Sequence, residues 1–493
     1  MMKNNFGIAL LGLGPGDPEL VTRQAWRLLE ESQEVYLRTR QHPVVSSFPS
    51  HLSVHSFDDL YESNETFEVV YSQIVDKVLI LGGRPEGVVF AVPGHPYVAE
   101  ATGPEIARRA RQQNIPLRVY QGLSFLEPVC TALHIDPIPQ TTLVDALEMA
   151  IAHVPSFPTS APAIIAQIYS RRIAAEVKLT LMALYPDEHP VKLVHAAGSS
   201  GEFVEELKLF EIDRSSNIGL ITSLYVPPLG PTTSFEAFQE IIAHLRAPDG
   251  CPWDRDQTHK SLRPYLLEET YEVLETLDAE DPSSMQEELG DLLLQIVLHA
   301  QIAAEEGEFT MADILHSIHT KIVYRHPHVF DDLRLTYSQG VLINWERLKA
   351  EERAQNGKET ESLLDGIAAA LPALVQAEEY QNRAVRVGFD WPDIGGVLDK
   401  LKEEIEEVQT ATGSDERFSE IGDLLFAVVN FARWCEIDAE SALRTANTRF
   451  KNRFHHIEKW ASSQGSGISD LSLNEMEALW QEAKRSEKPK SEK

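Results

Sequence analysis

Acidic residues with helical spacing in the second half of the chain point most directly to chemistry. Glu268-Glu269-x-x-Glu272 is followed by Glu288-x-x-Asp291. Residues three or four apart share one face of a helix, so each set presents carboxylates to one side, with either Glu268 or Glu269 beside Glu272. If the two faces meet, about four carboxylates surround one pocket. Oxygen ligands of this kind select Mg²⁺ or Mn²⁺ rather than zinc.

Basic residues and a tryptophan follow the acidic sets. Lys321 and Arg325 are four residues apart, as are Trp345 and Lys349. Cations at this spacing can clamp phosphate oxygens beside a metal ion, and the tryptophan can stack on a base or close the pocket. These parts suit phosphoanhydride hydrolysis, in which the metal neutralises the phosphates and lowers the pKa of a bound water that a carboxylate orients or deprotonates.

The whole ordered set occurs twice, with the second copy following the first at offsets of 128 to 135 residues. Four carboxylates, two cations on one helix, a tryptophan and a lysine recur as Glu404, Glu407, Glu420, Asp423, Arg449, Arg453, Trp480 and Lys484. A single acidic motif is more often a solvated helix face, and shared ancestry also repeats purely structural residues. Recurrence of the full set nevertheless favours the metal and phosphate interpretation.

Two patterns of apolar residues divide the chain into regions that must position these side chains. In the first region a strand, a loop and a helix are expected at 8–11, 12–18 and 20–31. Further strands are expected at 88–92, 117–120, 164–168, 193–196 and 218–224, and helices at 100–112 and 171–184. Such alternation predicts an α/β domain. In the second region apolar residues recur every three or four positions, which predicts helices.

A stretch rich in proline separates the two regions. Residues 227–233 read Pro-Pro-Leu-Gly-Pro-Thr-Thr and interrupt all periodicity, as a linker would. Because the helical region contains two copies of one pattern, we predict three domains. They are an α/β domain and two all-α units, at 1–228, 229–355 and 356–493.

Two loops of the α/β region are candidate ligand sites. Residues 12–18, Gly-Leu-Gly-Pro-Gly-Asp-Pro, follow the first strand and open a helix, where free backbone N–H groups favour a polar ligand. This loop matches neither the Rossmann nor the phosphate-loop fingerprint, and a tight structural turn is the alternative. Residues 92–97, Val-Pro-Gly-His-Pro-Tyr, again follow an apolar strand, so both loops are expected at one carboxyl edge of a sheet.

The two loops, together with Gly-Leu-Ser-Phe at 122–125, resemble motifs of the tetrapyrrole (corrin/porphyrin) methylase family, over residues 5–228. Members of that family hold S-adenosylmethionine between two α/β lobes. The resemblance therefore implies a two-lobed domain with a cofactor cleft near Pro15, Gly94 and Ser124. The second loop of the family usually reads Gly-Asp-Pro, whereas this chain has His95 in place of the aspartate.

The helical region closely resembles the MazG family of nucleoside triphosphate pyrophosphohydrolases over residues 232–488. Besides the repeated set, the resemblance includes Cys-Pro-Trp-Asp at 251–254 and His-Pro-His-Val-Phe at 326–330. Members form all-α units that cleave nucleoside triphosphates between the α and β phosphates with Mg²⁺. The implied metal ligands are Glu269, Glu272, Glu288, Asp291, Glu404, Glu407, Glu420 and Asp423. The implied phosphate ligands are Lys321, Arg325, Lys349, Arg449, Arg453 and Lys484.

The same resemblance bears on which copy is active and on assembly. In members with tandem copies the second one can carry the activity, so we expect the second copy to be catalytic here. Arg449 stands where the second copy of the family commonly has lysine, which retains the charge and alters the donor geometry. The family also suggests a homo-oligomer, most simply a dimer. The alternative is that the two copies pack on one another within one chain.

Composition limits the partners. The chain has 44 Lys and Arg against 76 Asp and Glu, a net charge of −32 that repels polyanions, so nucleic acid is not an expected partner. No apolar run approaches the roughly 20 residues that a membrane helix needs, and the three cysteines suit a reducing compartment. We therefore expect a cytoplasmic protein without a membrane partner.

Two other function classes remain open at this point. One is an S-adenosylmethionine-dependent methyltransferase whose helical half regulates it or dimerises it. The other is a non-catalytic scaffold or nucleotide sensor that keeps the fold. Intact carboxylates in both copies favour hydrolysis over the scaffold, and the leading prediction is a Mg²⁺-dependent enzyme that converts nucleoside triphosphates to monophosphates and diphosphate.

Overall fold

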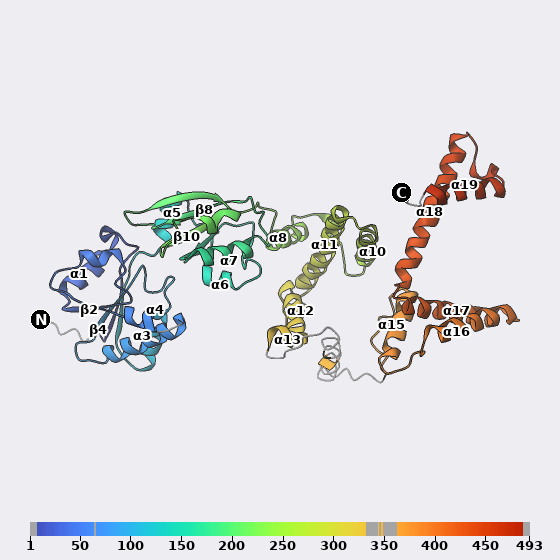
Figure 1. Cartoon of the computed structure of the whole chain (residues 1–493). Coiled ribbons are helices and arrows are strands. Elements are labelled where there is room, and N and C mark those ends of the chain that lie inside the picture. The colour runs from blue at the N-terminus through green and yellow to red at the C-terminus, as the bar shows by residue number, and fades with distance from the viewer. Residues whose placement is uncertain (1–6, 64–65, 332–343, 345–346, 349–361, 487–493) are drawn as a thin grey trace. The chain divides into compact units, whose positions relative to one another are not determined.

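The computed structural model of this chain describes residues 7–63, 66–331, 344, 347–348 and 362–486. These residues form two compact units, 1–251 and 252–493, which are described separately (Figure 1). Within the described ranges, no helix combines the length and the apolar character that a membrane crossing requires. The boundaries predicted from the sequence for three domains, at 1–228, 229–355 and 356–493, remain a prediction.

The first sheet of the first unit is entirely parallel, in the order β3-β2-β4-β1-β5. Its strands are β1 (Ile8–Gly12), β2 (Glu34–Leu37), β3 (Ser53–Ser56), β4 (Val88–Val92) and β5 (Leu117–Tyr120). The central strands are continuous apolar runs because both faces of the sheet are covered. Ile8 and Leu10 face one core, whereas Ala9 and Leu11 face the other.

Helices cover both faces of this sheet. On one face lie α3 (Phe67–Gly82) and α4 (Thr102–Gln112), and on the other lies α1 (Arg23–Glu31). Thr22 caps α1, because its hydroxyl accepts a hydrogen bond from the N–H of Ala25. A short helix, α2 (Asp58–Ser63), precedes α3. The α/β alternation expected from the sequence is confirmed here.

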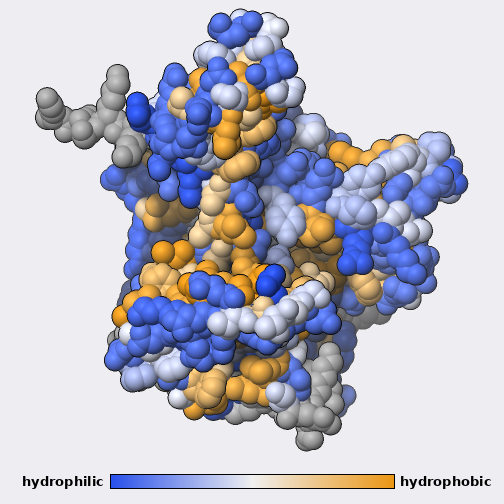
Figure 2. Space-filling view, turned by 90° about the vertical axis from the view of Figure 1, so that its right-hand side faces the viewer, coloured by the Kyte–Doolittle hydropathy of each residue, from blue (hydrophilic) through white to orange (hydrophobic). Residues whose placement is uncertain are grey.

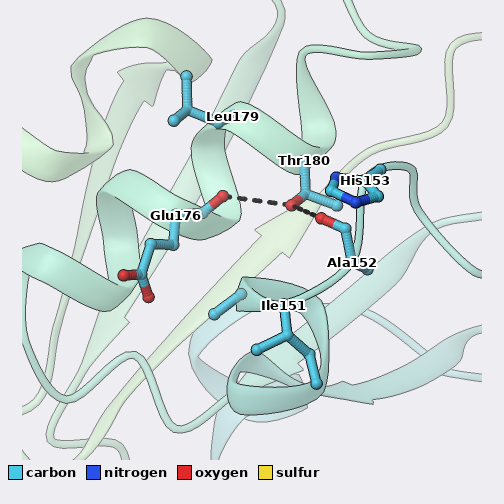
Figure 3. A pocket seen from close by; sticks show the side chains of 7 residues that line it. Ile151, Ala152, His153, Glu176, Leu179 and Thr180 are labelled. Carbon is cyan, nitrogen blue, oxygen red and sulfur yellow. Dashed lines mark hydrogen bonds between the residues drawn. The ribbon is translucent and has the colours of Figure 1, made fainter. Parts of the chain in front are cut away.

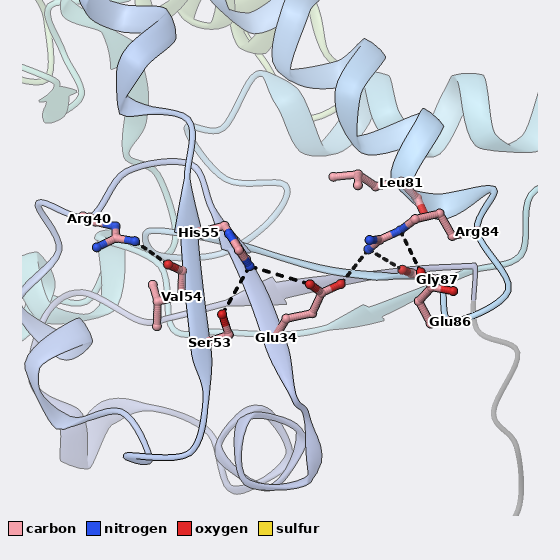
Figure 4. A network of polar contacts seen from close by, with 9 residues as sticks. All are labelled: Glu34, Arg40, Ser53, Val54, His55, Leu81, Arg84, Glu86 and Gly87. Carbon is pink, nitrogen blue, oxygen red and sulfur yellow. Dashed lines mark hydrogen bonds and ion pairs between the residues drawn. The ribbon is translucent and has the colours of Figure 1, made fainter.

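A polar network ties the amino-terminal ends of the strands together (Figure 4). Arg84, in the turn between α3 and β4, donates to Glu34 at 2.7 Å and to the carbonyl of Gly87 at 3.0 Å. His55 on β3 lies 3.7 Å from the same Glu34 carboxylate. The network thus links the turn before β4 to β2 and to the edge strand β3, at the end of the sheet opposite the two candidate loops.

The second sheet is mixed, in the order β6-β7-β10-β8-β9. Its strands are β6 (Thr142–Asp145), β7 (Ala163–Ala166), β8 (Pro190–His195), β9 (Phe203–Lys208) and β10 (Thr222–Val226). Only β6 and β7 are parallel to each other. On one face pack α6 (Ala146–Ala150) and α7 (Arg171–Leu181), and on the other packs α5 (Leu126–Leu133).

Two details of the second sheet differ from the sequence-based expectations. The strand expected at 218–224 begins only at Thr222, because the Thr222 hydroxyl accepts a hydrogen bond from Gly219 N–H at 3.0 Å and closes a turn. The strands β6 and β9 were not expected. In β9, which lies at one edge of the sheet, the sequence Phe-Val-Glu-Glu-Leu-Lys lacks the strict alternation of apolar and polar residues that marks a half-buried strand.

A small pocket of about 250 Å³ lies between α6 and α7 (Figure 3). The Thr180 hydroxyl crosses it, donating toward the carbonyls of Met149 and Ala152, both at 2.9 Å. Glu176 and His153 stand at its rim in Figure 3. Because the hydroxyl is already bonded to the protein, this pocket serves the packing of the two helices.

The helix that follows the proline-rich stretch, α8 (Phe235–Arg246), belongs to the first unit. The described part of the second unit contains helices and turns only. Its helices are α9 (Pro252–Arg255), α10 (Arg263–Ala279), α11 (Pro282–Glu306), α12 (Met311–Arg325), α13 (Pro327–Phe330), α15 (Ala373–Val385), α16 (Ile394–Thr410), α17 (Ser414–Trp434), α18 (Ala439–Ser463) and α19 (Leu473–Ser486). The predicted all-α region is confirmed.

Two helical hairpins correspond to the two copies of the repeat. In the first, α10 packs along α11, and in the second, α16 packs along α17. Side chains fix the helix starts: Asp281 accepts hydrogen bonds from Ser283 and Ser284 at the start of α11, and Asp393 does the same for α16. The acidic motifs therefore sit on paired helices, as the repeat predicts.

Apolar side chains remain exposed along both hairpins. Leu289, Leu293 and Ile296 on α11 are exposed, and the repeat-equivalent residues on α17 are exposed as well: Ile421, Leu425 and Val428. Figure 2 shows apolar patches between hydrophilic ones on the face it presents. Exposed apolar patches of this kind are a common feature of association surfaces.

A glycine at the start of α4 allows the second candidate loop to approach the helix. A Cβ on Gly103 would lie 1.9 Å from the carbonyl oxygen of Pro96, so Gly103→Ala must displace backbone. We expect this variant to lose about 1–3 kcal/mol of unfolding free energy, although alanine is the better helix former. Urea denaturation measures the change.

Gly219→Ala is the matched control, because a Cβ there meets only the carbonyl oxygen of Asn217, at 4.0 Å. An unchanged denaturation midpoint for Gly103→Ala would contradict the close approach of the loop to α4.

Candidate functional site

Three carboxylates come together on the first hairpin. Glu269 and Glu272 lie one turn apart on α10, and Glu288 lies on α11. One oxygen from each of the three lies within 4.8 Å of the others. Glu269 and Glu288 are half-buried, whereas Glu272 is exposed. Of the two glutamates left open by the sequence, it is Glu269 that joins the group.

The second hairpin repeats this arrangement. Glu404 and Glu407 on α16 and Glu420 on α17 also offer oxygens within 4.8 Å of one another. Glu404 is buried, with 4% of its surface exposed, and its Oε2 atom has no hydrogen-bond partner among the described residues. The structure thus groups the equivalent three carboxylates of each copy.

The fourth predicted ligand of each copy lies outside these groups of three. Asp291 and Asp423 are one turn beyond Glu288 and Glu420 on the same helices. Asp291 is near enough for its charge to raise the pKa of Glu269. Three carboxylates therefore form each group, and the aspartate lies one helical turn beyond it.

Electrostatics in both groups favour a positive partner. Burial, and then the charges of Asp291 and Glu272, raise the pKa of Glu269. Burial and the charge of Glu404 raise the pKa of Glu407. A raised pKa means that the ionised form of the carboxylate is destabilised. A bound divalent cation stabilises the ionised form again.

A lysine that the sequence analysis missed enters the second group. Lys400 Nζ lies 2.7 Å from Glu404 Oε1 and 2.9 Å from Glu403 Oε1. Hydrogen bonds to Glu404 and then Glu403 raise the pKa of this ammonium. The spacing of four between Lys400 and Glu404 was the available signal. The corresponding position of the first copy is Tyr265, so the two groups differ in charge.

The donor set fits a hard divalent cation. Each group offers carboxylate oxygens from two helices, and Mg²⁺ and Mn²⁺ prefer such ligands. In the second group the unpartnered Glu404 Oε2 is a buried acceptor that lacks a protein donor. A cation would satisfy it, whereas an empty group leaves an unpaired polar atom.

The basic and aromatic residues form a separate contact. The guanidinium of Arg453 on α18 lies 5.3 Å from the ring centre of Trp480 on α19, and Phe450 packs on the same ring at 5.2 Å. Arg449 and Lys484 on these two helices are exposed. The structure thus brings Arg453 to Trp480, and α18 packs along α19.

The first copy is described less completely. Lys321 is exposed and Arg325 is half-buried in the last turns of α12. Trp345 and Lys349 lie outside the described residues. The cationic pair of the first copy is therefore placed on one helix face, and its predicted tryptophan and lysine stay a sequence-based prediction.

In the first unit, the two candidate loops meet at the carboxyl ends of β1 and β4. Gly14 and Gly94 exchange backbone hydrogen bonds of 3.2 and 2.8 Å. A Cβ on Gly12 would lie 2.6 Å from both Gly94 O and Gly122 N, so the third loop is equally close. The expectation of one shared sheet edge is confirmed.

The three residues implied as a cofactor cleft lie on these loops. Pro15 touches the second lobe, since a Cβ on Gly198 would lie 2.6 Å from Pro15 Cγ. Gly94 has φ +67°, a conformation that favours glycine. Ser124 is buried, and its hydroxyl donates to Glu127 at 2.5 Å. Loop backbone from both lobes therefore borders one region.

His95 accepts a hydrogen bond within its own loop. Its Nδ1 accepts a hydrogen bond from Tyr97 N–H at 3.1 Å, two residues ahead, as an aspartate does in an Asx turn. The proton must then be on Nε2 in the neutral ring. The loop keeps its turn despite the change of residue.

Buried polar groups behind the loops escaped sequence reasoning. Arg38 Nη1 pairs with Glu100 Oε2 at 2.5 Å, and His42 Nε2 lies 3.1 Å from Gly14 O. Burial, with a smaller contribution from the charge of Arg38, lowers the pKa of His42 to about 4, so its ring is neutral near pH 7. No local spacing pairs residues as distant in sequence as Arg38 and Glu100.

The fold joins a two-lobed α/β domain to a helical region that carries two equivalent groups of three carboxylates. Comparison with family models supports both parts: the model for the MazG nucleotide pyrophosphohydrolase domain matches residues 257–330. The model for tetrapyrrole (corrin/porphyrin) methylases matches residues 7–213.

Similar proteins match either nearly the whole chain or about half of it. Protein YabN of Bacillus subtilis, described as uncharacterized, is 42% identical over 98% of this chain and 99% of its own length. A nucleoside triphosphate pyrophosphohydrolase/pyrophosphatase MazG of Thermotoga maritima is 43% identical, over 51% of this chain and 95% of its own. A nucleoside triphosphate pyrophosphohydrolase of Escherichia coli K12 is 46% identical, over 50% and 95%.

The chain therefore belongs to the MazG family of hydrolases, and it carries a tetrapyrrole methylase domain ahead of its MazG region. Both family resemblances stated from the sequence are confirmed.

Repulsion within the second group leads to a prediction about stability. Because the pKa of Glu407 is raised, ionisation of this group lowers the stability of the metal-free protein as pH rises through that pKa. We expect Glu407→Gln to raise the melting temperature of the metal-stripped protein at pH 7 and to reduce the further gain that Mg²⁺ produces. The difference between variant and wild type should shrink as pH falls through the raised pKa.

Glu406→Gln removes an exposed charge from the same helix outside the group, and serves as the control. A lower metal-free melting temperature for Glu407→Gln than for this control would contradict the repulsion.

Proposed function

We propose that the helical region is a Mg²⁺-dependent nucleoside triphosphate pyrophosphohydrolase that releases a nucleoside monophosphate and diphosphate. The observation that carries this proposal is the same cluster of three carboxylates, formed twice at repeat-equivalent positions. The names of the similar MazG proteins support the reaction class. Mn²⁺ is the alternative ion.

The carboxylates would hold the cation between the two helices of a hairpin. In the second copy the ligands would be Glu404, Glu407 and Glu420, with Asp423 completing the set. The bound ion supplies neutralisation of phosphate charge and lowers the pKa of a water molecule. A carboxylate of the set that stays free of the ion would orient that water or take its proton.

Cationic side chains would take the phosphates. Lys400 already pairs with Glu404, and an ion that replaced it there would free its ammonium for a phosphate oxygen. Arg449, Arg453 and Lys484 carry the remaining positive charge, and Trp480, with one face against Arg453, offers a surface for a base. In hydrolysis the water oxygen bonds to one phosphorus, the bridging P–O bond breaks, and diphosphate leaves.

We propose the second copy as the more active one, because it contains the buried, unpartnered Glu404 oxygen. Glu404→Gln/Glu407→Gln should lower kcat/KM for pyrophosphate release by roughly 10²–10³-fold, the scale expected for loss of charge stabilisation. Glu269→Gln/Glu272→Gln should retain most of the activity. Product chromatography with Mg²⁺ and a panel of nucleoside triphosphates measures both.

The control Glu406→Gln/Asp415→Asn removes two exposed charges from the same hairpin. Loss of activity only with the 269/272 pair would assign catalysis to the first copy, where the family model matches. No turnover at any Mg²⁺ concentration would contradict hydrolysis and favour a methyltransferase with a regulatory helical half, or a scaffold.

We also propose that the first unit binds S-adenosylmethionine beside Pro15, Gly94 and Ser124. The convergence of three loops at one edge of the first sheet, beside Gly198 of the second lobe, supports this, together with the match to the methylase family.

The turn made by His95 provides the test of cofactor binding. S-adenosylmethionine should raise the melting temperature of the first unit in the whole chain, and His95→Asp should keep that gain because it preserves the acceptor for Tyr97 N–H. His95→Leu should lose at least about half of it, since the acceptor is removed. His153→Leu, exposed elsewhere, is the control.

Equal stabilisation in all variants would show that the turn is irrelevant to binding, and no stabilisation of the wild type would contradict cofactor binding altogether. We further propose a homo-oligomer in the cytoplasm, with nucleoside triphosphates rather than nucleic acid as partners, on the exposed apolar helix faces and the net charge of −32.

A further inference from the structure

Two histidines face each other in the first helical copy, away from the glutamates of its hairpin cluster. His259 precedes α10, and His299 lies in the second half of α11. Their Nδ1 atoms are 2.7 Å apart, and the rings are nearly parallel, with an angle of 5° between their planes. At this distance at most one of the two nitrogens carries a proton, so at least one lone pair points at the other ring.

Two carboxylates adjoin His259. One ligand atom from each of His259, Glu306 and Glu308 lies within 4.8 Å of the others. Glu306 follows His299 by seven residues, two turns of the same helix, so both lie on one face. Gly307, with φ +73°, ends α11 and turns the chain before Glu308.

The surroundings of the histidines leave part of their bonding capacity unused. His299 Nε2 is buried and has no hydrogen-bond partner among the described residues. Burial, followed by the charge of His259, lowers the pKa of His299 and favours the neutral ring. A neutral imidazole with an available lone pair is a metal ligand rather than a salt-bridge partner.

We propose that His259 and His299, with Glu306 and Glu308, form a site for a divalent transition metal ion of the zinc type. Imidazole nitrogens with carboxylate oxygens suit zinc, cobalt or nickel, whereas the carboxylate clusters suit Mg²⁺. Two nitrogens bound tetrahedrally to zinc are about 3.3 Å apart, so the ion replaces the shared proton with a small separation of the rings.

The site belongs to the first copy alone. The positions equivalent to His259 and His299 in the second copy are Ile394 and Phe431, which offer no ligand. A bound ion would join the segment that precedes α10, including α9, to the far end of α11. The bound ion would therefore fix the beginning of the helical unit. This structural role does not depend on the hydrolytic activity.

The test uses the full chain stripped of metal and then saturated with Mg²⁺, so that the carboxylate clusters are occupied. Titration with Co²⁺ should give one equivalent with the visible absorption of a nitrogen-ligated, four- or five-coordinate ion, and Zn²⁺ should displace it. Zn²⁺ should also raise the melting temperature. His259→Asn/His299→Gln should abolish the spectrum and the gain in melting temperature.

Two further variants keep the result interpretable. Glu306→Gln/Glu308→Gln changes only exposed side chains and should weaken Co²⁺ binding by about tenfold or more. His316→Gln/His319→Gln, on the exposed surface of α12, and Glu269→Gln/Glu272→Gln should leave the spectrum unchanged. Equal Co²⁺ binding in wild type and the 306/308 variant, or a spectrum without nitrogen ligands, would overturn the proposal.

Discussion

Repulsion between carboxylates held on paired helices is the constraint on which the helical region depends. Each hairpin brings three glutamate oxygens within 4.8 Å of one another, and burial adds to the cost of their charge. Like charges on neighbouring helices destabilise a hairpin unless a cation compensates them. In the second copy, Lys400 compensates part of the negative charge, whereas the first copy has Tyr265 at that position.

The same comparison separates the two copies chemically. Their glutamates are equivalent, yet among the residues that the structure describes the first copy adds a histidine pair and the second adds an internal lysine. In the first unit, by contrast, the candidate ligand site is formed by loop backbone. Glycines allow three loops to approach within a few ångströms of one another at one sheet edge. The chain thus combines a site built from charged side chains with one built from close loop packing.

Much of this arrangement could be predicted from the sequence, because it depends on local spacing. Glutamates three apart share a helix face, and loops after parallel strands share a sheet edge, so the Glu404–Glu407 pair and the meeting of Gly14 with Gly94 followed directly. The strand at 222–226 was misplaced because a side-chain hydrogen bond from Gly219 N–H to Thr222 shortens it.

Contacts between residues distant in the sequence could not be predicted in the same way. The pairs Arg38–Glu100 and His259–His299 depend on which strands and helices become neighbours, and no local periodicity records that choice. Lys400 is different, because its spacing of four from Glu404 on one helix is visible in the sequence.

The measurement that tests the account most directly is equilibrium binding of Mn²⁺, followed by the loss of the free-ion electron paramagnetic resonance signal. The wild-type chain should bind Mn²⁺ in competition with Mg²⁺, and a variant with Gln at positions 269, 272, 404 and 407 should lose this binding. Mn²⁺ binding of the same stoichiometry and affinity in that variant would contradict the central claim that the paired carboxylates hold the ion.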